Sequence, residues 1–394
     1  MNEAATALNL PKRSQQEIQI LALVRESEGM SRVQLAQQMG LHLPAITLLT
    51  SSLIKEGLIR EEGLASSTGG RPSILLRLNP QAAYFLGVEV GLNFVRTLLT
   101  DLSGTVLQEV AEAVEKPLEL KALLSLIKSQ AAAVSRKAPS SRLKGMGVAV
   151  AGMVDRGRGL VLNANILGGS EPVALEAKLK AIFPDLPLVL HNDANAAALG
   201  EHWYGGARKV QNFFWVYLGL GTGLGIFSKG EIYLGAHGIA GELGFSCVGD
   251  NGEYLTKWAS GEALVSMLAA KLKAEGYARQ MALISQALAK GDAPVAEAVA
   301  KVGRRLGMAL AGMVNLFDPA EVFLGGPLLS LGTPLLEAMR QSFGDRLLLP
   351  QQYALQQSRL GEEAVARGAA ATVIREFLSS LRPSGRKPRK ARKR

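Results

Sequence analysis

Three short segments of the sequence carry residue types that can hold a polar, sugar-sized ligand. Residues 191–195 place short polar side chains directly after an apolar run, and residues 238–244 place one carboxylate between glycines. Carboxylates and amides of this kind hydrogen-bond ligand hydroxyls. Residues 219–225 contain four glycines, and backbone N–H groups exposed by glycines can cradle an anion such as a phosphate. The segments therefore indicate hydroxyl binding and anion binding.

Each segment also has an ordinary structural explanation. Residues 219–225 could form only a tight hairpin, and Asp193 or Asn195 could simply cap a helix that we expect to begin near Asn195. The glycine segment is not a Walker loop, because it lacks the Lys-Ser/Thr ending, and it does not open a helix as a dinucleotide fingerprint would. The residues alone leave these explanations open.

The segments lie within an α/β pattern that occurs twice along the chain. Each copy begins with three short strands joined by turns and continues with helices, which indicates an internal duplication. We expect two similar α/β subdomains, with a ligand cleft between them, over residues 81–380. The predicted strands are 85–91, 95–101 and 105–107 in the first copy, and 214–219, 226–227 and 231–234 in the second.

Residues 1–80 carry the signals of a winged helix-turn-helix domain. Ser14 and Ser31 are typical helix N-caps, and Gly40 ends the second helix in a tight turn. Pro44 suits the first turn of the third helix. Three short helices joined in this way predict a helix-turn-helix, and a helical dimerisation module that ends in a hairpin is the alternative.

The wing and the third helix would supply the DNA contacts. Two predicted strands, 58–60 and 74–78, flank a glycine pair that presents Arg71, which suits a narrow minor groove. The face of the third helix has no arginine, asparagine or glutamine, so we expect modest base specificity, with Leu48 against thymine methyl groups. The candidate DNA contacts are Arg32, His42, Pro44, Thr47, Leu48, Ser51 and Arg71.

The composition excludes several classes of protein. With 394 residues and 48% apolar side chains, the chain can bury a large core. A single cysteine, Cys247, excludes an intramolecular disulfide and a cysteine-built metal cage, and is typical of a reducing cytoplasm. Neither an export signal nor an apolar run long enough to span a membrane is found. We expect a cytoplasmic protein with no membrane partner.

The net charge of +10 is concentrated in one segment. Residues 382–394 hold eight basic side chains and no acidic one, so the rest of the chain has a net charge of only +2. Prolines and a glycine interrupt the segment, and we expect residues 381–394 to be disordered. The segment either binds nucleic-acid phosphates irrespective of sequence or only keeps the protein in solution. Both interpretations stay open.

Taken together, these features resemble the ROK family of repressors, open reading frames and kinases over nearly the whole chain. Residues 218–244 look like the family signature almost residue for residue, supported by residues 192–195 and by Gly325-Gly326. The resemblance implies a duplicated actin-like α/β fold of the sugar-kinase, RNase H-like type. The leading winged helix-turn-helix is of the kind that separates the family's repressors from its kinases.

The resemblance also implies roles for individual residues. Asn192 and Asp193 would bind sugar hydroxyls, with Glu242 and Asn165 as further hydroxyl ligands. In the family's kinases the equivalent aspartate is the base that activates the phosphoryl-accepting hydroxyl, so Asp193 would be a vestigial base and no residue would be catalytic. A vestigial phosphate loop would consist of Gly221, Thr222 and Gly223.

Departures from the family pattern argue against catalysis. The kinases begin their first subdomain with D-x-G-G-T, whereas this chain reads Glu89-Val90-Gly91-Leu92-Asn93. Leu92 brings a bulky side chain to a place where backbone must approach phosphate, and Asn93 replaces a phosphate-contacting hydroxyl. We therefore expect no productive ATP binding and no enzymatic activity.

The family's zinc site is altered as well. Phe245 stands at the position of its histidine, its three cysteines are absent, and Cys247 lies off the pattern. One soft ligand cannot build a tetrahedral site, so we expect no zinc and no other cofactor. The missing histidine and a missing glutamate also contact sugar in the family, so binding of the family's usual sugars is open to question.

The sequence thus predicts a DNA-binding transcriptional regulator, most simply a repressor of carbohydrate genes, whose kinase-like domain senses a sugar or sugar derivative without phosphorylating it. We expect a homodimer or higher homo-oligomer on a double-stranded operator. Two other hypotheses remain. One is an ATP-dependent sugar kinase with a fused DNA-binding domain, and the other is a regulator controlled by a protein partner with no sugar ligand.

Overall fold

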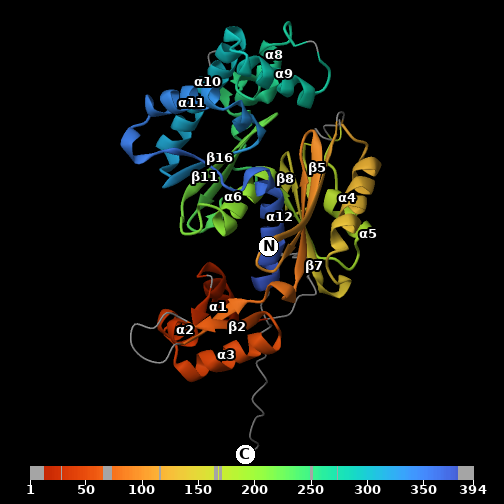
Figure 1. Cartoon of the computed structure of the whole chain (residues 1–394), viewed down its shortest axis with the longest axis vertical. Coiled ribbons are helices and arrows are strands. Elements are labelled where there is room, and N and C mark those ends of the chain that lie inside the picture. The colour runs from red at the N-terminus through yellow and green to blue at the C-terminus, as the bar shows by residue number, and fades with distance from the viewer. Residues whose placement is uncertain are drawn as a thin grey trace, which may run out of the picture. The chain divides into compact units, whose positions relative to one another are not determined.

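The computed structural model describes residues 13–27, 29–64, 73–114, 117–163, 167, 171–248, 252–272 and 274–379. The chain forms two compact units (Figure 1). The first unit comprises residues 1–83, 101–105 and 374–394, and the second comprises residues 84–100 and 106–373. The predicted domain limits at residues 80 and 380 stay predictions. Arg71, Asn165 and the basic segment 382–394 lie outside the described residues.

The described part of residues 1–83 contains the helices α1, α2 and α3 and a small antiparallel sheet. The helices begin where the capping signals place them, because Ser14 and Ser31 both form complete capping boxes. Gly40 follows the second helix in the left-handed conformation, as expected for a glycine at this turn. The elements are α1 (Gln15–Glu26), α2 (Arg32–Met39), α3 (Leu43–Lys55) and a sheet in the order β1 (Met30–Ser31), β3 (Ile74–Leu78), β2 (Ile59–Leu64).

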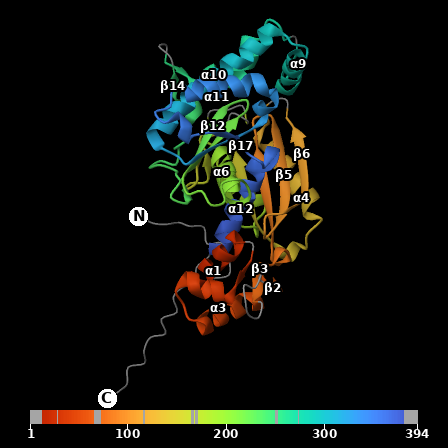
Figure 2. The same cartoon turned by 60° about the vertical axis from the view of Figure 1, so that its left-hand side comes forward.

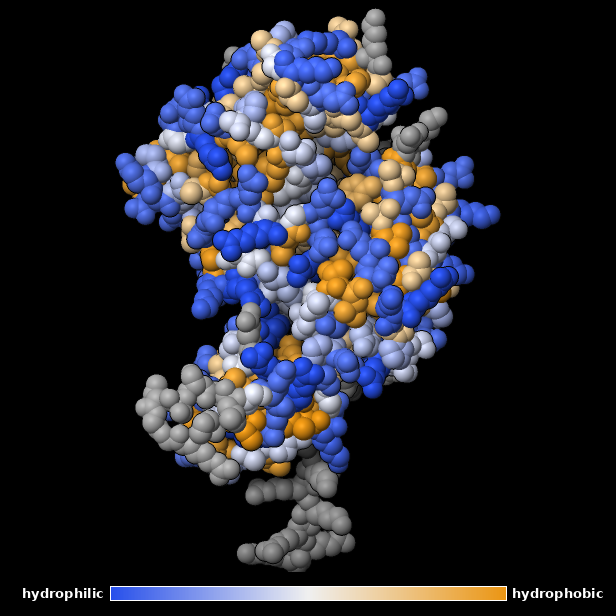
Figure 3. All heavy atoms as spheres, in the orientation of Figure 1, coloured by the Kyte–Doolittle hydropathy of each residue, from blue (hydrophilic) through white to orange (hydrophobic). Residues whose placement is uncertain are grey.

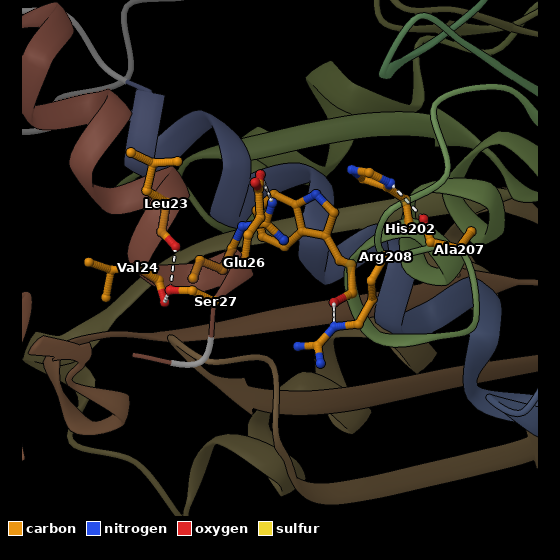
Figure 4. A network of polar contacts seen from close by, with 9 residues as sticks. Leu23, Val24, Glu26, Ser27, His202, Ala207 and Arg208 are labelled. Carbon is orange, nitrogen blue, oxygen red and sulfur yellow. Dashed lines mark hydrogen bonds and ion pairs between the residues drawn. The ribbon is translucent and has the colours of Figure 1, made fainter. Parts of the chain in front are cut away.

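The end of α1 is closed by a side chain. The hydroxyl of Ser27 donates a hydrogen bond of 2.7 Å to the carbonyl oxygen of Leu23, which also accepts the backbone N–H of Ser27 at 3.1 Å (Figure 4). The apolar faces of the three helices and of β3 are buried, and their fully buried members include Ile20, Leu35, Ile46, Leu53 and Leu76.

The second unit holds two five-stranded sheets of the same topology. The first sheet has the order β10-β7-β4-β5-β6, in which β4, β7 and β10 run parallel. The second has the order β13-β12-β11-β16-β17, in which β11, β16 and β17 run parallel. Each sheet is therefore a three-stranded meander extended by two parallel strands, and the predicted duplication is confirmed.

Helices complete both halves of the second unit (Figures 1 and 2). The first half contains β4 (Tyr84–Val90), β5 (Phe94–Asp101), β6 (Val106–Ala113), α4 (Leu120–Ser135), β7 (Leu143–Val150), β8 (Val154–Asp155), β9 (Leu160–Val161), α5 (Leu175–Ile182), β10 (Leu188–Asn192) and α6 (Asp193–Tyr204). The second half contains β11 (Phe213–Leu218), β12 (Thr222–Ser228), β13 (Glu231–Ile232), β14 (Cys247–Val248), β15 (Glu253–Tyr254), α7 (Leu255–Trp258), α8 (Gly261–Met267), α9 (Tyr277–Ala289), α10 (Ala293–Phe317), β16 (Glu321–Gly325), α11 (Thr333–Gly344), β17 (Leu355–Gln357) and α12 (Ala364–Ser379).

Three element boundaries differ from the predictions. The third strand of the first copy extends to Ala113, because β6 pairs along the whole of β5. Its exposed face carries polar residues, and for this reason the apolar pattern did not predict its full length. The glycine segment 219–225 is a loop only at residues 219–221, since β12 begins at Thr222. Helix α6 begins at Asp193 and not near Asn195.

Among the described residues, no helix is long and apolar enough to cross a membrane. On the face shown in Figure 3, hydrophilic and hydrophobic side chains are interspersed.

Candidate functional site

The polar junction between β10 and α6 is built around Asn192. Its Oδ1 accepts a hydrogen bond of 3.0 Å from the backbone N–H of Asn195, which makes Asn192 the helix N-cap. Its Nδ2 donates to the carbonyl oxygen of Gly152 at 3.1 Å and to Oδ1 of Asp193 at 3.0 Å. The suggestion that Asp193 or Asn195 caps the helix is therefore wrong, and Asp193 remains available for another role.

The carboxylate of Asp193 lies in the first turn of α6. Its Oδ1 accepts a 2.7 Å hydrogen bond from the backbone N–H of Ala194 in addition to the bond from Asn192. Both of these bonds end on the same oxygen. Burial raises the pKa of Asp193 to about 6, although its hydrogen bonds oppose the shift. The group is thus an ionisable acceptor whose second oxygen, Oδ2, takes no part in these two bonds.

The glycines of β12 allow α6 to approach this strand closely. A Cβ atom on Gly225 would lie 2.4 Å from the carbonyl oxygen of Ala194, and one on Gly223 would lie 3.2 Å from the Cβ of Ala194. Any side chain at Gly225 would push the first turn of α6, and Asp193 with it, away from the sheet. Packing therefore accounts for these two glycines without a phosphate.

The other end of α6 is fixed by two side chains of the same region. Nδ1 of His202 lies 3.1 Å from the carbonyl oxygen of Ala207, and Nε of Arg208 donates a 3.2 Å hydrogen bond to the carbonyl oxygen of Trp203 (Figure 4). The ring of His202 also packs against Phe227 of β12, with 4.5 Å between ring centroids. Both ends of the helix are thus tied to the second half of the unit.

Glu242 is brought to the same place by a glycine turn. Gly241 adopts a φ of +90°, and a Cβ atom on it would lie 2.0 Å from the carbonyl oxygen of Leu224 in β12. The backbone N–H of Leu224 donates to the carbonyl oxygen of Gly241 at 3.1 Å. Burial raises the pKa of Glu242 to about 7, and the charge of Asp193 acts in the same direction. Asn192 bonds to Asp193 and the charge of Asp193 acts on Glu242, so the residues predicted from these two segments lie near one another.

A third carboxyl, Glu89 near the end of β4, faces the same region. Its side chain is 3% exposed, and among the described residues its Oε2 has no hydrogen-bond partner. Burial raises the pKa of Glu89 to about 8; the charge of Arg96 lowers it and the charge of Asp193 raises it. Arg96, which sequence reasoning missed, forms ion pairs with Glu109 at 3.2 Å and Glu362 at 2.8 Å.

The two glycine-containing turns of the second unit meet through an apolar side chain. Cδ1 of Leu92 lies 4.0 Å from the position that a Cβ atom would take on Gly221. The hydroxyl of Thr222 donates to the carbonyl oxygen of Ala259 at 2.9 Å, and the N–H of Gly219 donates to the carbonyl oxygen of Gly221 at 3.0 Å. Within the predicted phosphate loop, the hydroxyl of Thr222 is therefore already engaged, and the side chain of Leu92 lies beside Gly221.

An aromatic pair occupies the region of the family's zinc site. The rings of Phe245 and Tyr254 meet edge to face with 5.6 Å between centroids, and Cys247 pairs with Tyr254 across the β14–β15 hairpin. In the part of the chain that the structure describes, no group of three His, Cys, Asp or Glu side chains could hold a metal ion. The donor set does not fit tetrahedral zinc.

Helix α3 presents the predicted DNA-contacting face. Leu48 is 75% exposed, and Pro44, Thr47 and Ser51 are exposed as well. The hydroxyl of Thr47 donates to the carbonyl oxygen of Leu43 at 2.8 Å, so this hydroxyl is already engaged within the helix. His42 is the N-cap residue of the helix but makes no side-chain capping hydrogen bond. The face is therefore largely apolar.

Arg32 is held inside the first unit. Its Nε donates a 3.0 Å hydrogen bond to Oγ1 of Thr50, and its Nη1 pairs with Glu61 at 2.7 Å. These two interactions occupy Nε and Nη1 of the guanidinium. No local pattern in the sequence indicates this pairing, because the two residues lie in different elements.

Comparisons with known proteins agree with this architecture. The ROK family profile matches residues 85–376. The xylose repressor of Caldicellulosiruptor bescii is 30% identical over 91% of this chain and 95% of the repressor. A ROK family transcriptional regulator, a homologue of the E. coli MLC protein, has a crystal structure that matches with a TM-score of 0.74 and 25% identity over 92% of this chain and 96% of the regulator.

A catalytic relative is also similar. The ROK family glucokinase from Streptomyces griseus, solved with glucose and AMPPNP, matches with a TM-score of 0.64 and 26% identity over 74% of this chain and 99% of the kinase. The duplicated sheets define an actin-like fold of the sugar-kinase type, joined here to a winged helix-turn-helix. The chain belongs to the ROK family.

Proposed function

We propose that this protein is a sugar-responsive transcriptional repressor. The observation that carries the proposal is that one chain combines an exposed, largely apolar recognition helix α3 with the polar site of Asn192, Asp193 and Glu242. Double-stranded operator DNA would contact α3, and a sugar or sugar derivative would bind the carboxylates. A homodimer would place two such helices on operator half-sites about one helical turn apart.

The sensor would bind its ligand without phosphorylating it. Asp193, with a pKa of about 6, is mostly ionised at pH 7 and can accept a hydroxyl hydrogen bond through Oδ2. In a sugar kinase the same carboxylate would act as the catalytic base, so a kinase is the alternative function. Leu92 beside Gly221 argues against it, because phosphoryl transfer depends on close backbone and cation contacts to the phosphates. We therefore propose no zinc, no ATP and no turnover.

Ligand sensing requires that the effector bind the DNA-bound and the released conformations of the protein with different affinities. A sugar that prefers the released state would lower the affinity for DNA by the ratio of its two affinities. Repression exerted on chromosomal DNA would take place in the cytoplasm.

Selection from a random duplex library with the full-length protein tests the proposal. We expect one duplex family to be enriched, and a screen of monosaccharides and their phosphates to find one that lowers its affinity at least tenfold. Failure to enrich any duplex would reject the repressor. An enriched duplex with no responding sugar would favour control by a protein partner. Sugar-dependent ATP consumption would favour the kinase.

A further inference from the structure

Helix α12 (Ala364–Ser379) belongs to both compact units. Its residues 364–373 are part of the second unit, and its residues from 374 onward are part of the first. It is one uninterrupted helix, in which each turn is hydrogen-bonded to the next. A displacement of its first turns is therefore passed on to its last turn.

Within the second unit, α12 is in backbone contact with α6, the helix that carries Asp193 in its first turn. A Cβ atom on Gly368 of α12 would lie 1.8 Å from the carbonyl oxygen of Ala196. A Cβ atom on Gly200 of α6 would lie 2.8 Å from the carbonyl oxygen of Ala364. Because neither position has room for a side chain, the two helices pack rigidly against each other, and a shift of α6 displaces α12.

The same part of α12 also lies on the first sheet. A Cβ atom on Gly147 of β7 would lie 1.8 Å from the carbonyl oxygen of Ala369, and one on Gly87 of β4 would lie 2.0 Å from the carbonyl oxygen of Ala366. The first half of α12 is thus held by the elements that carry Asn192 and Asp193, with little freedom to move independently of them.

The last turn of α12 is anchored in the first unit. Arg13, which precedes α1, is fully buried, and its Nη1 donates a 2.7 Å hydrogen bond to the carbonyl oxygen of Phe377. The guanidinium carbon lies 5.0 Å from the centroid of the Phe377 ring, and Nε lies 3.9 Å from Oε2 of Glu56. Glu56 is the C-cap residue of α3. One guanidinium therefore joins the end of α12 to the end of the recognition helix.

We infer that α12 couples the sugar site to the recognition helix, through its packing on α6 in the second unit and through the Arg13–Phe377 contact in the first. The inference rests on the proposed repressor function and concerns the regulation of the same site. A sugar that shifts the first turn of α6 shifts α12, and through Arg13 it shifts the end of α3. Coupling of this kind requires an element with two positions that both ligands bias, and α12 is that element.

The test introduces a flexible joint into α12 between its two anchors. In one variant Arg375 and Glu376, which lie between Ala369 and Phe377, are both replaced by glycine. In the matched control both are replaced by alanine, which removes the same side chains and keeps the helix. For each full-length protein we compare the affinity for the selected duplex without sugar and with the monosaccharide or sugar phosphate from the screen that lowers this affinity most. The ratio of the two affinities measures the coupling.

The alanine variant should show the same ratio as the natural chain. In the glycine variant the ratio should fall at least fivefold, while the affinity for the sugar in the absence of DNA, measured by calorimetry, stays within about twofold of the natural value. An equal ratio in the glycine and alanine variants would overturn the inference. An alanine variant that loses the coupling as completely as the glycine variant would overturn it too, because the side chains and not the continuity of the helix would then be responsible.

Arg13→Lys tests the other anchor with the helix left intact, and it decides the matter if the glycine variant does not fold. Lysine keeps the positive charge but lacks the planar fork with which the guanidinium contacts Phe377 and Glu56 together. The ratio should again fall at least fivefold, and a ratio equal to that of the natural chain would overturn the inference. If the natural chain itself binds no selected duplex, or responds to no sugar, the proposed function has failed, which is a different result.

Discussion

Leu92 and Gly221 lie against each other across the two halves of the second unit, with 4.0 Å between Cδ1 of Leu92 and the place of a Cβ atom on Gly221. Each residue belongs to a glycine-containing turn that follows the first strand of its own sheet. We expect this leucine side chain to hinder the approach of a nucleotide phosphate. The role of this contact can be tested by substituting Leu92 alone.

We predict that the natural chain does not bind MgATP at millimolar concentration, and that Leu92→Gly binds it at least tenfold more tightly. The reason is that removing the side chain lets the backbone approach a phosphate. Isothermal titration calorimetry with a non-hydrolysable ATP analogue measures this. Leu92→Ile, which keeps the volume, is the matched control and should bind as poorly as the natural chain. Tight binding by the natural chain would contradict the prediction.

Asp193 is predicted to be a ligand group and Asn192 a structural cap. Asn192→Ala should lower the free energy of unfolding by about 0.5 to 2 kcal/mol, the usual loss for an N-cap. Near pH 4, where the raised pKa of Asp193 costs little stability, Asp193→Asn should leave the melting temperature close to the natural value. It should weaken sugar-induced release from DNA at least tenfold, because a charged acceptor contributes about 1.5 to 3 kcal/mol per hydrogen bond. DNA binding without sugar should be unchanged in Asp193→Asn. Full release at natural sugar concentrations would remove Asp193 from the site.

Stability should fall as pH rises from about 4 to about 8. The pKa values of Asp193, Glu242 and Glu89 are raised to about 6, 7 and 8 in the folded protein, so the folded state holds more protons than the unfolded chain in this window. The contribution of these carboxyls is fully present below their unfolded pKa values and is lost as pH rises through the folded ones.

Glu89→Gln removes the carboxyl whose pKa is raised furthest, and therefore isolates its contribution to the pH dependence of stability. At pH 8 the variant should be more stable than the natural chain by at least about 1.4 kcal/mol, which corresponds to one pKa unit, and the difference should vanish near pH 4. Denaturant unfolding at several pH values measures this. Glu112→Gln on the exposed face of strand β6 makes the same chemical change at the surface and is the matched control. A pH-independent effect of Glu89→Gln would show that its burial does not control titration.

Leu48 is predicted to read thymine methyl groups in the major groove. Replacing thymine by uracil at one contacted position of the selected duplex should weaken binding about fourfold, near the 0.8 kcal/mol expected for one buried methyl group. Leu48→Ala should bind the natural duplex more weakly and should lose the difference between thymine and uracil. If the uracil effect persists in Leu48→Ala, another residue makes the contact.

Local signals in the sequence are sufficient to predict much of the first unit. Ser14 and Ser31 cap the predicted helices because a capping box depends only on residues three positions apart. Strand β1 could not be predicted, because a strand of two residues is too short to show an alternation of apolar and polar side chains. The pairing of Arg32 with Glu61 escapes it too, because it joins residues 29 positions apart whose contact depends on the packed fold.

The candidate site could be predicted only in part. The family resemblance, and not the spacing of the residues, leads to the expectation that Asn192, Asp193 and Glu242 share a site. Glu89 stands out in the sequence only as a departure from a phosphate loop, because its burial and raised pKa depend on neighbours from other elements. The return of Phe377 to Arg13 leaves no local signal, because it joins positions 364 residues apart.

The Arg13–Phe377 contact also sets an order of events during synthesis. At about 5 to 20 residues per second, Phe377 leaves the ribosome roughly 20 to 70 s after Arg13. Until then the nascent first unit lacks the turn that covers its buried guanidinium. A chain interrupted anywhere in the second unit therefore never completes its first unit.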